Sequence, residues 1–74
     1  MSEIEFDPEY VFSHHRATPE KLESYAAIHK AAQHFAETLL KHVPACEDRT
    51  VALQYLREAS MMACAAISLD GRLK

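Results

Sequence analysis

The chain contains one glycine, two cysteines, no basic excess and no long apolar run. Because the single glycine, Gly71, is near the end of the sequence, no glycine-rich loop is available to cradle a phosphate. The two cysteines, Cys46 and Cys64, are too few for a disulfide scaffold and lack the paired spacing of a zinc site. This sparse cysteine usage favours free thiols in a reducing compartment.

Charge and hydropathy argue against two kinds of partner. Eight Lys and Arg residues stand against eleven Asp and Glu residues, so no general basic field can hold a DNA or RNA duplex through its phosphates. No apolar run approaches the roughly 20 residues that span a bilayer, and no secretory signal pattern is visible. We therefore expect a cytosolic protein that binds neither duplex nucleic acid nor membrane.

The middle of the chain predicts a long amphipathic helix over residues 18–43. Thr-Pro-Glu at 18–20 is typical of a helix start, because Thr caps free N–H groups, Pro fits the first turn and Glu opposes the helix dipole. Apolar residues then recur at spacings of three and four up to Val43. Pro44 ends the helix, since it cannot donate the next backbone hydrogen bond.

The last third of the chain predicts a second helix over residues 46–70. Two acidic residues at 47–48 provide negative charge at its start, although Cys46 at the capping position is a weak acceptor. Gly71 is expected to occupy the left-handed C′ position that ends the helix.

The segment 58–69 lacks the polar stripe that a surface helix normally keeps. Two helices joined by a short turn form an antiparallel hairpin, and a hairpin of 74 residues cannot cover such a segment alone. We predict an all-α fold: a single helical-hairpin domain over 1–74, with a short N-terminal arm at 1–17, assembled as a homo-oligomer. The stripes that face each other within the hairpin are expected to include Leu22, Tyr25, Phe35, Leu39, Leu56, Ala59 and Met62.

Basic and imidazole groups near the start of the first helix form a candidate binding site. Its members are His14, His15, Arg16, His29 and Lys30. Arg and Lys attract phosphates, while imidazole rings stack on bases or donate to phosphate oxygens. In a symmetric oligomer the arm of one copy can meet the helix of the next and close around a ligand.

Other interpretations of these residues remain open. In one, Val11 and Phe12 tuck against the first helix and the neighbouring histidines are merely solvated. A metal site made of histidines and a carboxylate is conceivable, but no ligand spacing is diagnostic. Cys64 has alanines on both sides, which indicates inert packing rather than a nucleophile. The sequence therefore predicts a binding protein that is not an enzyme and needs no cofactor or metal.

Four motifs together resemble those of a known family. They are Phe-Ser-His-His at 12–15, Tyr-x-x-Ile-His-x-Ala-Ala-x-x-Phe-Ala at 25–36, Pro-x-Cys at 44–46, and Leu-x-x-Leu-x-x-Ala-x-Met-Met-Ala-Cys-Ala-Ala-Ile at 53–67. Over about residues 12–69 the chain is similar to the phage helical-hairpin proteins that act as cyclic-nucleotide sponges in anti-CBASS and anti-Thoeris defence.

The resemblance implies a homo-oligomer, commonly a hexamer, that works in the host bacterial cytoplasm and sequesters immune second messengers without cleaving them. The implied ligands are cyclic di- or trinucleotides such as cyclic GMP-AMP, or cyclic ADP-ribose derivatives in the Thoeris branch. It also implies that His14 stands at the position of a base-stacking Tyr, that His15 matches a family His and that His29 replaces a basic residue which reaches phosphate. Because histidine is only partly charged near neutral pH, ligand affinity is then expected to depend on pH.

Three departures from the family pattern weaken the case for a second, trinucleotide-type pocket: Cys64 replaces Asn, Met62 replaces Trp and Leu69 stands where a basic residue is expected. A different function also remains open. In that alternative the chain is an interaction module that binds a partner protein through its apolar second helix.

Overall fold

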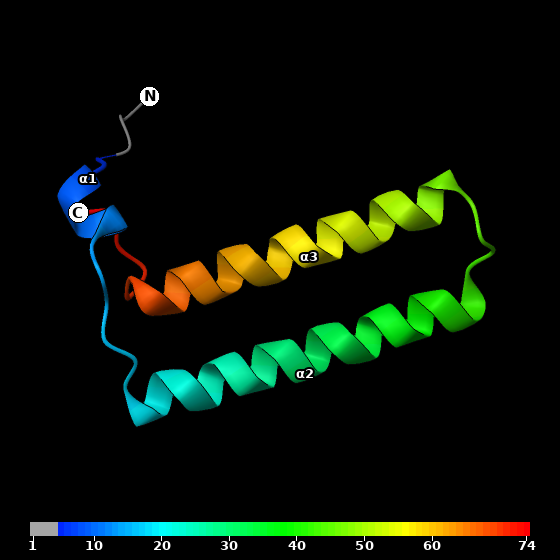
Figure 1. Ribbon diagram of the computed structural model, residues 1–74, viewed down its shortest axis with the longest axis horizontal. Helices are drawn as coiled ribbons and strands as arrows, with labels where there is room; N and C mark the ends of the chain where they lie inside the picture. Colours follow the sequence, from blue (N-terminus) through cyan, green and yellow to red (C-terminus); the bar gives the residue numbers. More distant parts are fainter. Residues whose placement is uncertain (1–4) are drawn as a thin grey trace.

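The computed structural model describes residues 5–74 as a helical hairpin preceded by one short helix (Figure 1). The elements in chain order are α1 (Pro8–Phe12), α2 (Pro19–His42) and α3 (Glu47–Ser68). Every regular element within the described range is a helix, so the all-α prediction is confirmed. The first four residues of the predicted arm lie outside that range.

Local sequence signals explain both ends of α2. The Thr18 hydroxyl accepts a hydrogen bond from the Lys21 backbone N–H at 3.2 Å, and Pro19 occupies the first turn. At the other end Val43 leaves the helical conformation, as expected for the residue before Pro44. The helix therefore begins and ends at residues that the sequence marks.

The two ends of α3 differ in how well they are capped. Cys46 makes no side-chain capping bond at the N-terminal end. At the C-terminal end the Gly71 N–H donates to the Ala66 carbonyl at 2.8 Å and the Asp70 N–H donates to the Ile67 carbonyl at 3.2 Å, which is a Schellman motif. The left-handed C′ residue is Asp70, with φ of 56°, so the expectation of Gly71 there is wrong by one position.

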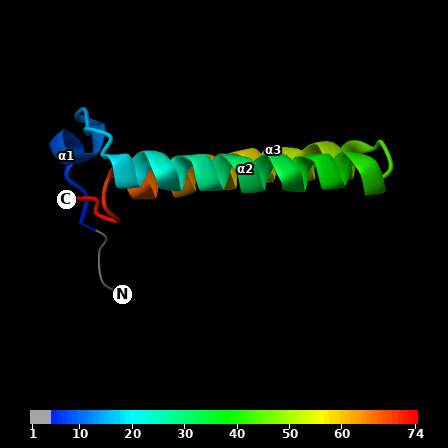
Figure 2. The same ribbon diagram turned by 90° about the horizontal axis from the view of Figure 1, so that it is seen from below.

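The two long helices run side by side in opposite directions over their whole length, as both ribbon views show (Figures 1 and 2). The molecule measures 43 × 35 × 19 Å. Half-buried positions recur every three or four residues on each helix and mark the seam between them. They are Lys21, Tyr25, Ile28, Ala32, Ala36 and Leu39 on α2, and Arg49, Ala52, Leu53, Leu56, Ser60, Ala63, Cys64, Ile67 and Ser68 on α3.

The seam differs in part from the predicted facing stripes. The prediction is right for Tyr25, Leu39 and Leu56, which are half-buried, and for Phe35 and Ala59, which line the groove between the two helices. It is wrong for Leu22 and Met62, which are exposed and are not among the residues that line that groove. Met62, for example, keeps 68% of its surface exposed. The apolar arc of each helix is wider than one partner helix can cover, and small residues such as Ala63 take half-buried positions of the seam. The bulky side chains are therefore left on the flanks.

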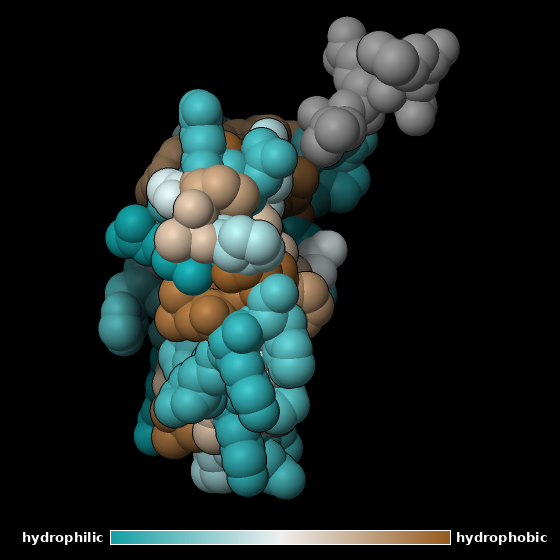
Figure 3. All heavy atoms as spheres, turned by 90° about the vertical axis from the view of Figure 1, so that its right-hand side faces the viewer, coloured by the Kyte–Doolittle hydropathy of each residue, from teal (hydrophilic) through white to brown (hydrophobic). Residues whose placement is uncertain are grey.

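Within residues 5–74 no side chain is fully buried, so a single chain has no core of its own. Seen from the hairpin turn, apolar surface is exposed between polar side chains (Figure 3). The large apolar side chains exposed along the two long helices are Leu22, Phe35, Leu40, Val51, Tyr55, Met61 and Met62. None of the described helices has the length and hydropathy to cross a bilayer.

Candidate functional site

Tyr10, on α1, joins the N-terminal arm to the residues that follow α3. Its hydroxyl donates to the Leu69 carbonyl at 2.7 Å and accepts from Nη2 of Arg72 at 3.2 Å. The Arg72 guanidinium carbon also lies 4.8 Å from the centre of the Tyr10 ring, within range of a cation–π contact. The hydrogen bond to the Tyr10 hydroxyl raises the pKa of Arg72 above its ordinary value.

The same tyrosine holds the loop between α1 and α2. The Tyr10 carbonyl lies 2.6 Å from Nε2 of His15 and accepts a hydrogen bond from the Ser13 hydroxyl at 2.9 Å. The His15 ring meets the Tyr10 ring edge-on, with centroids 4.7 Å apart. Because a carbonyl only accepts, Nε2 of His15 must carry the proton in this contact, which leaves Nδ1 for a ligand.

The residues on either side of His15 are free to meet a ligand. His14 and Arg16 are both exposed in the loop. Phe12 is 80% exposed and pairs with the Phe6 ring at a centroid distance of 6.0 Å, so it does not tuck against α2 as one interpretation of the arm required. The arm packs instead on the end of the chain.

His29 and Lys30 lie further along α2 and are exposed. Nε2 of His29 is 3.6 Å from the Cys64 thiol, a contact that crosses the hairpin to α3. The rise of an α-helix places His29 about 15 Å beyond Pro19. One chain therefore keeps the arm group (His14, His15 and Arg16) apart from the helix group (His29 and Lys30).

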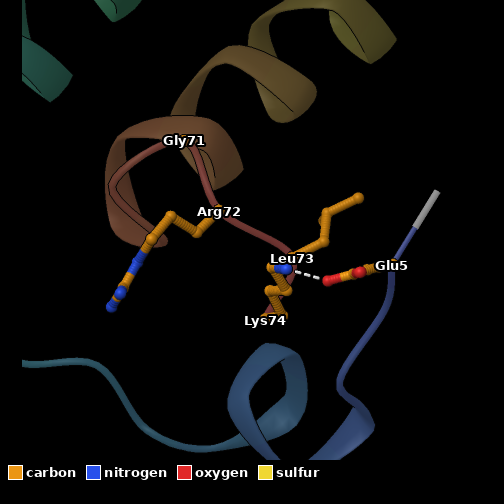
Figure 4. Close-up of a pocket in the computed structure, with 5 residues that line it drawn as sticks. All are labelled: Glu5, Gly71, Arg72, Leu73 and Lys74. Atoms are coloured by element: carbon orange, nitrogen blue, oxygen red, sulfur yellow. Dashed lines mark hydrogen bonds and ion pairs between the residues drawn. The ribbon is translucent and has the colours of Figure 1, made fainter.

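Two lysines, one on α2 and one at the end of the chain, form ion pairs in this region. Nζ of Lys21 donates to the Ser68 carbonyl at 3.1 Å and pairs with the Asp70 carboxylate at 3.3 Å. Lys74 pairs with Glu5 in an open pocket of about 500 Å³, while Arg72 points away from that pair (Figure 4). The lysines here already have partners, so this surface holds the arm and the chain end together.

An apolar groove of about 260 Å³ runs along the seam of the hairpin. It is lined by Ile28, Ala31, Ala32, Phe35, Leu56, Ala59, Ser60 and Ala63. With one hydroxyl among its lining side chains, the groove suits an apolar side chain rather than an anion. No cluster of three or more His, Cys, Asp or Glu side chains that could hold a metal ion is found in the described part of the chain.

Sequence reasoning missed α1, the contacts of Tyr10 and Arg72, and the pairing of His29 with Cys64. Tyr10 and Arg72 are 62 positions apart and follow no helical period, so no local pattern predicts their contact. The Asp-Pro pair at 7–8 does signal a short helix, since Asp7 caps the Glu9 N–H at 3.0 Å and Pro8 begins the first turn.

Comparison with known proteins identifies the family. No curated protein and no solved structure matches the chain. The model of the family described as Acb2/Tad1, hairpin domain, matches residues 7–68, a span that contains α1, the loop, both long helices and all five predicted site residues. Because that match covers most of the sequence, the chain belongs to the Acb2/Tad1 hairpin family, the anti-CBASS and anti-Thoeris sponges.

Proposed function

We propose that this protein is a phage sponge that sequesters cyclic oligonucleotide second messengers of bacterial antiviral defence, in the host cytoplasm and without cleaving them. The family match over residues 7–68 is the observation that carries the proposal, because the family binds and sequesters rather than catalyses. Sequestration requires only mass action, and a dissociation constant of 1 μM already corresponds to about −8 kcal/mol.

The proposed ligand site forms between copies of the chain in a homo-oligomer, which the family resemblance suggests is a hexamer. Two features of the single chain support assembly: it has no core, and its hairpin seam carries an apolar groove. The position of His29, about 15 Å along α2 from Pro19, points the same way, because the arm group precedes that helix. An arm group from one copy and a helix group from its neighbour can enclose a ligand that neither group reaches alone.

Each proposed site residue offers a distinct contact. Arg16 and Lys30 provide permanent positive charge for phosphate oxygens, and exposed His14 provides a flat ring for a base. His15 and His29 each have Nε2 engaged, by the Tyr10 carbonyl and the Cys64 thiol, so a ligand contact by either ring would use Nδ1. These contacts suit a small, doubly or triply charged cyclic phosphate.

The test is calorimetric titration with cyclic GMP-AMP, a cyclic trinucleotide and cyclic ADP-ribose, followed by heat denaturation and mass analysis of the released ligand. The proposal expects at least one cyclic oligonucleotide to bind and to be recovered unaltered. Binding of cyclic ADP-ribose alone would assign the protein to Thoeris signals instead. Recovery of a linear product, or no binding across the panel, contradicts the proposal.

The exposed apolar surface also fits a second function, a helical-hairpin module that binds a partner protein. The two functions predict different oligomeric states for the isolated protein. Light scattering that reports a stable single chain of 8.4 kDa would favour the interaction module. A closed oligomer hides the same surface and favours the sponge.

A further inference from the structure

A three-residue contact closes the end of the hairpin where α1 meets the residues that follow α3. We call it the latch: the Tyr10 side chain, the Leu69 carbonyl and the Arg72 guanidinium. Backbone pairing reinforces it, because the Asp7 N–H donates to the Leu73 carbonyl. Figure 1 shows the outcome, with α1 and the C-terminus side by side beyond the open end of α2 and α3.

The latch is continuous with the loop that carries the exposed His14 and Arg16. The Tyr10 carbonyl bonds to Nε2 of His15, and the Tyr10 ring packs against the His15 ring. At the other end of the loop the Thr18 cap begins α2. The loop is therefore held at both ends, and the residues between project to solvent.

We propose that Tyr10 and Arg72 are positioning residues for the ligand site: they fix the loop so that His14 and Arg16 are arranged before the ligand arrives. This inference rests on the proposed function and adds residues to its site. Ordering a loop at the moment of binding lowers affinity, so a loop that is already ordered binds more tightly with the same contacts. Neither residue needs to touch the ligand.

Hydrogen exchange without ligand tests whether the latch orders the loop. Tyr10→Phe removes the hydroxyl but keeps the ring against His15, and Arg72→Gln removes the guanidinium from an exposed position beyond α3. Both variants are expected to raise exchange at the Asp7 and Val11 amides, which hydrogen-bond in the arm that leads into the loop, by about fivefold or more, because each variant loses a hydrogen bond of the latch. Arg57→Gln, at an exposed arginine in the middle of α3, is the matched control and should not change it.

Ligand titration of the same variants tests the link to binding. Each latch variant is expected to weaken affinity by about threefold to tenfold. Combined with His14→Ala, it should cause a smaller loss than it does in the wild-type protein, because only the Arg16 contact then remains to be ordered. A residue that acts only on overall stability would give additive losses instead.

The two readouts separate this inference from the proposed function. Unchanged exchange in both latch variants, unchanged affinity, or additive losses with His14→Ala would overturn the positioning role. If the wild-type protein binds no ligand of the panel, the proposed function and the ligand role of the latch both fall, even where exchange rises as expected.

Discussion

The open end of the hairpin and the flanks of its long helices differ in whether their side chains find partners within one chain. At the open end Tyr10, His15 and Lys21 find hydrogen-bond partners within the chain. Along the flanks, apolar side chains such as Phe35 and Met62 remain more than half exposed. Within residues 5–74 the contacts of one chain hold the open end, whereas the apolar flanks stay uncovered. The oligomer proposed above would supply that cover.

The largest expected effect comes from breaking the apolar flank with a charge. Met62→Glu should dissociate the oligomer into single chains, because burying an unpaired carboxylate in an apolar contact costs several kcal/mol. Gln54→Glu, which adds the same charge at an exposed polar position of the same helix, should leave the assembly intact. Light scattering measures the mass of both, and an unchanged mass for Met62→Glu would refute the role of this flank.

A smaller effect is expected from the histidines that are proposed to contact the ligand at the open end and on α2. His14→Ala and His29→Ala should each weaken binding of the cyclic nucleotide about tenfold, His14 through loss of stacking on a base and His29 through loss of a hydrogen bond to a phosphate. His42→Ala, exposed at the last position of α2, is the control and should bind normally. Calorimetry that gives the same affinity for both site variants as for the wild type would count against the site.

Helix capping is expected to have a smaller effect, which we compare first at the capped start of α2. Thr18→Ala removes the capping bond of α2 and is expected to lower the free energy of unfolding by about 1 kcal/mol. Thr38→Ala is the control, because the Thr38 hydroxyl only donates back to the His34 carbonyl within α2. Urea denaturation at one protein concentration compares them. Equal losses in the two variants would show that the cap adds nothing.

The smallest effect is a gain at the uncapped start of α3. Cys46→Ser supplies a hydroxyl where the thiol makes no capping bond, and should raise the free energy of unfolding by about 0.5 kcal/mol. Cys46→Ala, which supplies no acceptor, should not. If the melting temperature rises equally in both variants, the gain in stability comes from loss of the thiol and not from a cap.

The sequence predicts those parts of the fold that depend on neighbouring residues. Thr18 and Pro44 mark the ends of α2 because capping and the proline restriction are local. The motif at 53–67 supported the family resemblance, which the match over residues 7–68 confirms. Helical periodicity also located the apolar arc of each helix, which set the antiparallel pairing.

The rest depends on contacts between distant parts of the chain. Periodicity could not tell which residues of an overly wide apolar arc meet across the seam, so Leu22 and Met62 were misplaced. The contact between Tyr10 and Arg72 spans 62 positions, so the sequence around either residue does not predict it. The same is true of His29 and Cys64, which only the packing of α2 on α3 brings together.

Native mass spectrometry of the protein with cyclic GMP-AMP tests the central claim most directly, because it weighs the assembly and its ligand together. The expected species is a multiple of the 8.4 kDa chain that carries whole, uncleaved ligand molecules. A single chain without ligand, or an assembly that carries only a cleaved product, would contradict the claim that copies of this chain jointly sequester a cyclic nucleotide.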